Sequence, residues 1–304
     1  MSAMSTAPLI SIGIPTYNRG HAISDAIVSI QKQDFDNWEL IISDNASPDN
    51  TEEVVRAFAE KDPRIKYFKQ AMNVGPRSNF TFTRDKAKGK YFMWISDDDE
   101  LVPGLLSQYF QFMESNPEFV LVSGEIKYWI KDKLVMVETN LGREEKNPLL
   151  RSFLYYFKVR HGAFLHGLQR LSVSSKVPLR SVIGNDWHYV ASLAHVGKVK
   201  QLKIEGYNKD FEGGSRSFVS YARTYGERKI WGYFPYCKIA LDIFREYVYK
   251  SPILTKSNFL MRFLAGTSLA LWVLLRAYFY VYPKVFFQNY RKVPELIKSK
   301  LTTL

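Results

Sequence analysis

The sequence predicts an α/β fold built on a mainly parallel central sheet. Short apolar runs of strand length alternate with segments of helical spacing through the first hundred residues, as in chains that wind strands and helices into a parallel sheet. Polar residues follow the apolar runs at Thr16, at Asp44 and at Asp97. Ligands of such sheets bind outside the carboxyl ends of the strands. These three positions therefore predict a binding site at one edge of the sheet.

The elements follow in a regular order as far as residue 122. Asn50 with Glu53 predicts a capping box at the start of the second helix. Residues 124–171 show no clear period, and the aromatic and basic residues near 155–161 fit an acceptor-binding region or a buried helical face equally well. We expect strands at 9–14, 39–43, 65–68, 91–95, 119–122 and 198–204, and helices at 21–33, 50–60, 78–88, 103–115 and 186–196.

The most informative motif is the run Asp97-Asp98-Asp99, which ends an apolar strand. Three adjacent carboxylates repel one another at neutral pH, so stability alone does not explain them. Hard divalent cations bind carboxylate oxygens and often share their shell with substrate phosphates. The run therefore predicts a Mn²⁺ or Mg²⁺ site, with a solvated acidic turn before the next helix as the alternative.

Composition narrows the class of protein. The chain has 304 residues, 46% of them hydrophobic, which suffices for a large core. Cys237 is the single cysteine, so there is no internal disulfide framework. Residues 1–8 lack the basic start and apolar core of a signal peptide. We therefore expect a cytoplasmic location.

The formal net charge of +12 implies an anionic partner. Between Ser251 and Leu304 there are eight Lys or Arg residues and one acidic residue, Glu295, interspersed with aromatic and aliphatic side chains. This pattern favours an anionic membrane surface over nucleic acid. Arg262 and Arg276 bracket an apolar run of 13 residues, too short to span a bilayer comfortably. We expect an amphipathic helical segment that lies at the membrane or, alternatively, packs as a core helix.

Four motifs follow one another along the chain: residues 9–19 (LISIGIPTYNR), 40–51 (LIISDNASPDNT), 73–75 (NVG) and 95–103 (ISDDDELVP). In this order they resemble the motifs of family 2 glycosyltransferases, which have the GT-A fold. The first resembles the family's opening strand and turn, the second its second signature, the third the motif after its third strand, and the fourth its metal-binding DXD segment. The resemblance implies transfer of a sugar from a nucleotide diphosphate-sugar to an acceptor hydroxyl.

By this resemblance, the metal would be held by Asp98 with support from Asp99, and Asp97 would contact the ribose. Ser96 stands where the family usually has its first DXD aspartate, which leaves open how the three carboxylates divide their roles. For Asp44 and Asn45 the alternative is a turn-capping role, and for Arg77 a surface role. The expected nucleotide-binding residues are Pro15, Thr16, Tyr17, Arg19, Asp44, Asn45, Arg77 and Asp97.

The resemblance also places a general base at Asp186, where Asn185 replaces the family's usual Glu. An inverting transfer needs such a base to remove the acceptor's proton; the alternative for Asp186 is an ordinary N-cap. Arg216, in a Gly-rich loop, would close over the diphosphate as a mobile lid or remain a solvated loop residue.

These expectations divide the chain into a glycosyltransferase domain over 1–222 and a helical, membrane-associating region over 223–304. Residues 9–105 would form the nucleotide-binding half and 106–222 the acceptor-binding half. The expected activity is metal-dependent, inverting sugar transfer to a glycan or polyprenyl-linked acceptor in cell-surface polysaccharide biosynthesis, at the inner face of the membrane. The alternatives are a nucleotidyltransferase acting on sugar phosphates and a catalytically silent GT-A module at the membrane. The donor sugar and the oligomeric state stay open.

Overall fold

The computed structural model describes residues 7–130, 132–210, 222–223 and 226–281. The chain divides into two compact units, Met1–Tyr233 and Phe234–Leu304. The first unit extends past residue 222 because the helix α9 (Lys229–Tyr233) belongs to it.

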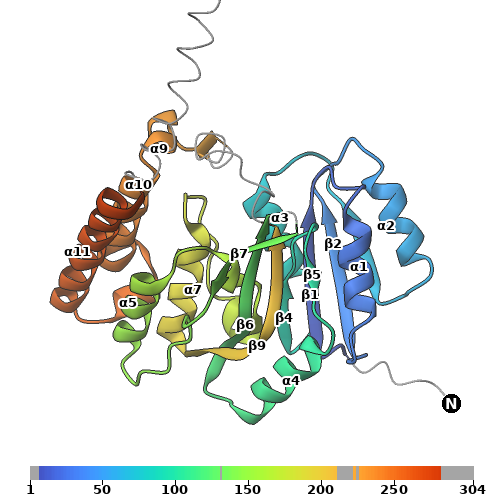
Figure 1. The fold of residues 1–304 in the computed structure, drawn as a ribbon, viewed down its shortest axis with the longest axis horizontal. Helices are drawn as coiled ribbons and strands as arrows, with labels where there is room; N and C mark the ends of the chain where they lie inside the picture. The colour runs from blue at the N-terminus through green and yellow to red at the C-terminus, as the bar shows by residue number, and fades with distance from the viewer. Residues whose placement is uncertain (1–6, 131, 211–221, 224–225, 282–304) are drawn as a thin grey trace, which may run out of the picture. The chain divides into compact units, whose positions relative to one another are not determined.

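The first unit contains a nine-stranded sheet in the order β3-β2-β1-β4-β8-β6-β9-β5, with β7 paired to β6 (Figure 1). Strands β1 to β4 of the nucleotide-binding half are parallel, as predicted, whereas the short β5 pairs antiparallel with β9. The other half is mixed, because β8 runs antiparallel to both β4 and β6 while β6 and β9 run parallel. The strands are β1 (Ile10–Thr16), β2 (Trp38–Asp44), β3 (Ile65–Lys69), β4 (Tyr91–Trp94), β5 (Glu100–Leu101), β6 (Phe119–Ile130), β7 (Lys133–Glu138), β8 (Leu168–Arg170) and β9 (Lys198–Asp210).

Helices cover this sheet and leave the central strands fully enclosed. Every residue of β1 and β2 is buried, as expected for strands with both faces covered. The helix predicted at 21–33 is confirmed as α1, in which Ile23, Ile27 and Ile30 are all buried. Besides α9, the helices described in this unit are α1 (Ile23–Gln31), α2 (Thr51–Ala59), α3 (Pro76–Asp85), α4 (Leu105–Ser115), α5 (Pro148–Lys158), α6 (Leu171–Ser174) and α7 (Asn185–Val196), with a 3-10 turn at Ala163–His166.

Two local predictions are wrong. Asn50 makes no side-chain cap at the start of α2; Asp49 instead accepts hydrogen bonds from the N–H and hydroxyl of Thr51. The last strand is also longer than its sequence pattern suggested. β9 continues to Asp210 because it pairs along β6 as far as Trp129, so Tyr207 and Lys209 lie on a strand rather than on a loop.

The aromatic and basic residues near 155–161 include both buried and exposed side chains. Tyr155 and Tyr156 of α5 are fully buried, which fits the buried helical face. Phe157, Lys158 and Arg160 are exposed. The aromatic run therefore serves mainly as core.

The second unit is helical. It contains α10 (Pro235–Arg245) and α11 (Phe259–Arg276), which pack against each other, with π turns at Glu246–Lys250 and Ala277–Val281. Phe259–Phe279 is 21 residues long, and by length and composition it could cross a membrane. Arg262 lies inside this helix, where its guanidinium is buried and donates to the carbonyls of Tyr247 and Val248. The expected position of this segment at a membrane stays a prediction.

Candidate active site

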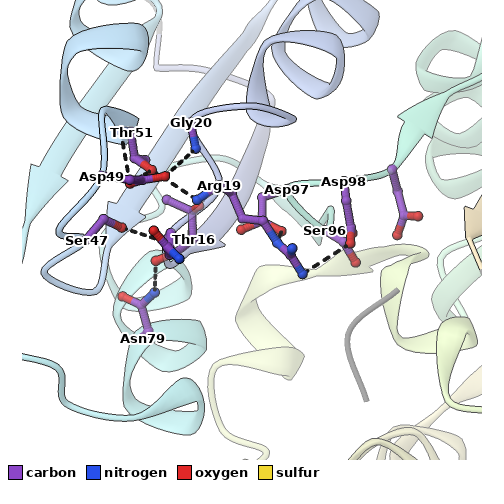
Figure 2. Close-up of polar contacts among 12 residues, drawn as sticks. Thr16, Arg19, Gly20, Ser47, Asp49, Thr51, Asn79, Ser96, Asp97 and Asp98 are labelled. Carbon is purple, nitrogen blue, oxygen red and sulfur yellow. Dashed lines mark hydrogen bonds and ion pairs between the residues drawn. The ribbon is translucent and has the colours of Figure 1, made fainter. Parts of the chain in front are cut away.

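The loops after β1 and β4 bring together three of the predicted site residues. The Arg19 guanidinium lies 3.5 Å from a carboxylate oxygen of Asp97 and 3.6 Å from one of Asp98. Figure 2 shows Arg19 extending from its loop toward these two carboxylates. Both strands end at the same edge of the sheet, so the predicted convergence of polar residues there is observed.

The loop after β1 is held by hydrogen bonds to the loop after β2 (Figure 2). The N–H of Asn18 donates to Ser47 Oγ, that of Arg19 to Thr51 Oγ1, and that of Gly20 to Asp49 Oδ2. Asn18 has a φ of 60°, a left-handed conformation that asparagine tolerates better than most residues. These bonds fix the backbone that follows Tyr17. The Tyr17 side chain is 47% exposed and could meet a ligand.

Asp97 and Asp98 are only partly open to solvent, with side chains 14% and 26% exposed. Burial raises the pKa of Asp97 to about 6, and the charge of Asp98 adds to this, while Arg19 opposes it. Burial also raises the pKa of Asp98, with Asp99 contributing and Lys209 and Arg19 opposing. Both carboxylates would therefore gain from a nearby cation.

Asp99 differs from its two neighbours because its carboxylate is already paired. Its side chain is 1% exposed, and Oδ2 accepts from the Tyr207 hydroxyl at 2.7 Å and from Lys209 Nζ at 3.1 Å. Burial raises the pKa of Asp99, but Lys209 and Tyr207 outweigh it, so the net shift is downward. Asp99 therefore holds Lys209 and Tyr207 in place, and its expected support of the metal site stays a prediction.

The donor set fits a hard cation that completes its shell with substrate. Asp97 and Asp98 offer carboxylate oxygens that are partly exposed and carry raised pKa values. Within the described ranges, no three His, Cys, Asp or Glu side chains are grouped around one metal position. Mn²⁺ or Mg²⁺ bound here would need further ligands, and such ions commonly take them from phosphates and water.

Asp44 and Asn45 lie at the end of β2, and their side chains hydrogen-bond to neighbouring segments. Asp44 is fully buried; Oδ1 accepts from the N–H and hydroxyl of Ser47, and Oδ2 from the Tyr67 hydroxyl at 2.6 Å. The Asn45 side chain donates to Asn73 Oδ1 and accepts from the N–H of Val74. These contacts give both residues a structural role, and their predicted contact with the nucleobase stays a prediction.

The other predicted nucleotide-binding residues are less directly placed. Pro15 and Thr16 are buried at the end of β1 and support the loop from below. Arg77 is exposed in the first turn of α3. Arg216 lies outside the described residues. Their ligand contacts stay predictions.

Asp186 lies in the first turn of α7. Its alternative assignment as an N-cap is wrong, because Gly184 occupies that position with a left-handed φ of 78°. Burial raises the pKa of Asp186, while the N–H of Trp187, which donates to its carboxylate at 2.9 Å, and the charge of Lys209 oppose this. A raised pKa is what a carboxylate general base needs near neutral pH.

Lys209 acts on both the aspartate run and Asp186. It was not predicted as a site residue from the sequence. Besides Asp99, its ammonium lies 3.4 Å from Ser96 Oγ. Its charge lowers the pKa of Asp98, Asp99 and Asp186. The residues after 204 match β-strand alternation poorly, and only the pairing of β9 along β6 reveals that Lys209 faces the aspartates.

Comparisons with known proteins agree with this arrangement. Residues 11–171 match the model of "Glycosyl transferase family 2". The chain is 38% identical over 138 residues to a GalNAc(5)-diNAcBac-PP-undecaprenol beta-1,3-glucosyltransferase of Campylobacter jejuni, a match covering 45% of this chain and 42% of that one. It is 31% identical over 153 residues to the abequosyltransferase RfbV of Salmonella typhimurium, covering 45% and 46%. The chain thus spans less than half the length of these curated relatives.

Solved structures show the same fold. S. aureus TarS 1–349 in complex with UDP-GlcNAc has a TM-score of 0.58 at 18% identity, covering 83% of this chain and 72% of that one. The mannosyltransferase PcManGT of Pyrobaculum calidifontis, in complex with GDP-Man and Mn²⁺, has a TM-score of 0.56 at 14% identity, covering 95% and 81%. The fold is therefore GT-A-like, as the sequence predicted. With more than half of its length matched by the family model, the chain belongs to glycosyl transferase family 2.

Proposed function

We propose that this protein transfers a sugar from a nucleoside diphosphate-sugar to an acceptor hydroxyl, with inversion at the transferred carbon. The observation that carries the proposal is the grouping of Arg19, Asp97 and Asp98 at one edge of the sheet, with Lys209 acting electrostatically on both Asp98 and Asp186. The donor diphosphate and the carboxylate that removes the acceptor's proton would then both be affected by the charge of Lys209. Family membership favours this activity over nucleotidyl transfer.

In this proposal the loop after β1 binds the nucleoside. Tyr17 packs on the base from its hydrogen-bonded loop, and Asp97 accepts from the ribose hydroxyls. The Arg19 guanidinium lies where it can reach the donor's phosphates. A divalent cation held by Asp98 would neutralise the negative charge that develops on the departing diphosphate. Asp99 keeps Lys209 beside that carboxylate, where its ammonium adds positive charge.

Asp186 would act as the general base. It accepts the proton of the acceptor hydroxyl as that oxygen attacks the sugar from the side opposite the leaving group, which gives inversion. Its raised pKa supports this role, because the base must hold the proton after transfer.

We further propose that the acceptor is lipid-linked and that the second unit binds the cytoplasmic face of a membrane. The C. jejuni relative's name specifies an undecaprenol-linked acceptor. Length and composition do not distinguish a membrane helix from a core helix, but the exposure of apolar side chains favours a membrane helix. Apolar residues are exposed along α11 and the turn after it, at Phe259, Leu260, Met261, Phe263, Leu264, Leu271, Leu274, Leu275, Tyr278 and Phe279.

A screen of nucleotide-sugars tests the donor half of the proposal. We expect one UDP-, GDP- or dTDP-sugar to raise the melting temperature in the presence of Mn²⁺, and to be slowly hydrolysed with release of the nucleoside diphosphate. EDTA should abolish the hydrolysis, and Mn²⁺ should restore it. No stabilisation and no hydrolysis with any donor would leave the catalytically silent module as the better description.

A further inference from the structure

We infer that Gly162 and Glu138 are positioning residues for the Asp186 carboxylate, a role that rests on the proposed base. Gly162 ends the loop between α5 and the 3-10 turn Ala163–His166, and Glu138 ends β7. Neither residue stands out in the sequence. In the structure Gly162 lies directly against the Asp186 side chain, and Glu138 holds the loop that carries Gly162.

The contact at Gly162 is unusually close. A Cβ built on this glycine would lie 1.4 Å from Asp186 Oδ2 and 2.2 Å from Cγ. The carboxylate of Asp186 therefore occupies the space that any side chain at 162 would need. Gly162 has a φ of −92° and a ψ of 0°, which other residues also adopt. Glycine is required here by the carboxylate and not by the backbone.

Glu138 fixes the loop that carries Gly162. Its Oε1 accepts from the N–H groups of Arg160 and His161, both at 3.1 Å, and its Oε2 accepts from the Tyr128 hydroxyl at 3.0 Å. Glu138 is 5% exposed. A buried carboxylate with three donors has little capacity left for substrate, so its role is to hold the two residues before Gly162 in place.

The same carboxylate lies in the electrostatic field of Asp186. Burial raises the pKa of Glu138, and the negative charge of Asp186 adds to this rise. Asp186 also acts on the hydroxyl groups of Tyr128 and Tyr155, and Lys209 is the cation that opposes burial at Asp186. These groups lie on β6, β7, β9 and α5. A small displacement of the loop before Gly162 would change the position of the Asp186 carboxylate relative to the acceptor.

Substitutions at Gly162 and Glu138 test the inference in steady-state kinetics with the donor found in the screen. We expect Gly162→Ala to lower kcat by about 10- to 100-fold, since misplacing a catalytic group by an ångström costs that order, with the donor KM unchanged. Gly142→Ala is the matched control, because its Cβ would meet only backbone of residues 199–201, at 3.0 Å or more. Glu138→Ala should also lower kcat, whereas Glu138→Gln should recover most of it, because the amide oxygen still accepts from both loop N–H groups.

Wild-type kcat in Gly162→Ala, or equal loss in Glu138→Ala and Glu138→Gln, would overturn the inference. A rise in donor KM that matches the fall in kcat/KM would do so as well, since Gly162 and Glu138 act on the base and not on the donor. If Gly162→Ala does not fold, as judged by its thermal melt, the two Glu138 variants decide alone. A wild-type protein without activity toward any donor would instead refute the proposed function.

Discussion

At the scale of single residues, ionised carboxylate in the site lowers the stability of the ligand-free protein. Asp97 has a folded pKa of about 6 against an ordinary value of 3.8. The folded state therefore binds its proton more tightly than the unfolded state, and ionised Asp97 destabilises the fold above pH 6. The difference corresponds to about 1–3 kcal/mol. Destabilising groups of this kind are common in sites that bind a ligand.

We therefore expect Asp97→Asn to raise the free energy of unfolding at pH 8 by about 1–3 kcal/mol while abolishing sugar transfer. The gain should shrink as the pH falls through 6, where wild-type Asp97 takes up its proton. Urea denaturation at pH 8 and pH 5 measures both values. A variant that is less stable than wild type at pH 8 would contradict the raised pKa.

Tyr17 provides a second prediction at this scale. Its exposed ring is held on a hydrogen-bonded loop, so stacking on a nucleobase should contribute on the order of 1–3 kcal/mol. Tyr17→Ala should raise the donor KM about 5- to 100-fold with kcat little changed. Tyr17→Phe keeps the ring and serves as the control. Equal KM values for the alanine and phenylalanine variants would remove Tyr17 from the base pocket.

At the scale of elements, the four parallel strands are joined by a buried carboxylate on β2. Glu39 is 3% exposed and accepts from the Ser11 hydroxyl of β1, Lys66 Nζ of β3 and the N–H of Lys88 before β4. Burial raises its pKa, but these three donors outweigh burial and lower it. The resulting stability is present above pH 4.5 and is lost as the pH falls through the lower folded pKa.

Glu39→Ala should destabilise the protein by about 2–4 kcal/mol at pH 7, because it leaves buried donors without an acceptor. The donor KM should change little, since this cluster lies at the start of the strands and the site lies at their ends. Glu52→Ala, which removes an exposed carboxylate paired with Lys69 and Arg56, should alter stability only slightly. Equal effects of the two variants in urea denaturation would refute the role of Glu39.

Prediction from sequence was most reliable for elements with a strong local pattern. The first four strands and their helices follow from apolar runs and spacing, and the convergence of Arg19 with Asp97 follows from the parallel order. The pairing of Asp99 with Lys209 does not follow, because it depends on the register of β9 along β6, more than a hundred residues away in the chain. The contact between Gly162 and Asp186 is likewise tertiary, and no local property of a glycine in an ordinary conformation indicates it.

At the scale of the whole molecule, an α/β unit is joined to a helical unit with exposed apolar side chains. We expect the protein to float with vesicles of phosphatidylcholine and phosphatidylglycerol. Leu260→Glu with Leu264→Glu should abolish flotation, because these leucines are 63% and 57% exposed and a charge there opposes burial in lipid. Leu134→Glu, at an exposed leucine of β7, is the matched control and should leave flotation unchanged. Flotation retained by the double variant would contradict membrane binding through α11.

In the proposed reaction the aspartate run binds the donor and the cation, and Asp186 removes the acceptor's proton. The most direct measurement is sugar transfer from the stabilising donor to a lipid-linked acceptor by wild type, Asp98→Ala and Asp186→Asn. We predict that both variants keep the wild-type fold and lose transfer, that Asp98→Ala also loses Mn²⁺-dependent donor stabilisation, and that Asp186→Asn retains it. Transfer retained by Asp98→Ala, or donor stabilisation lost in Asp186→Asn with transfer intact, would contradict the central claim.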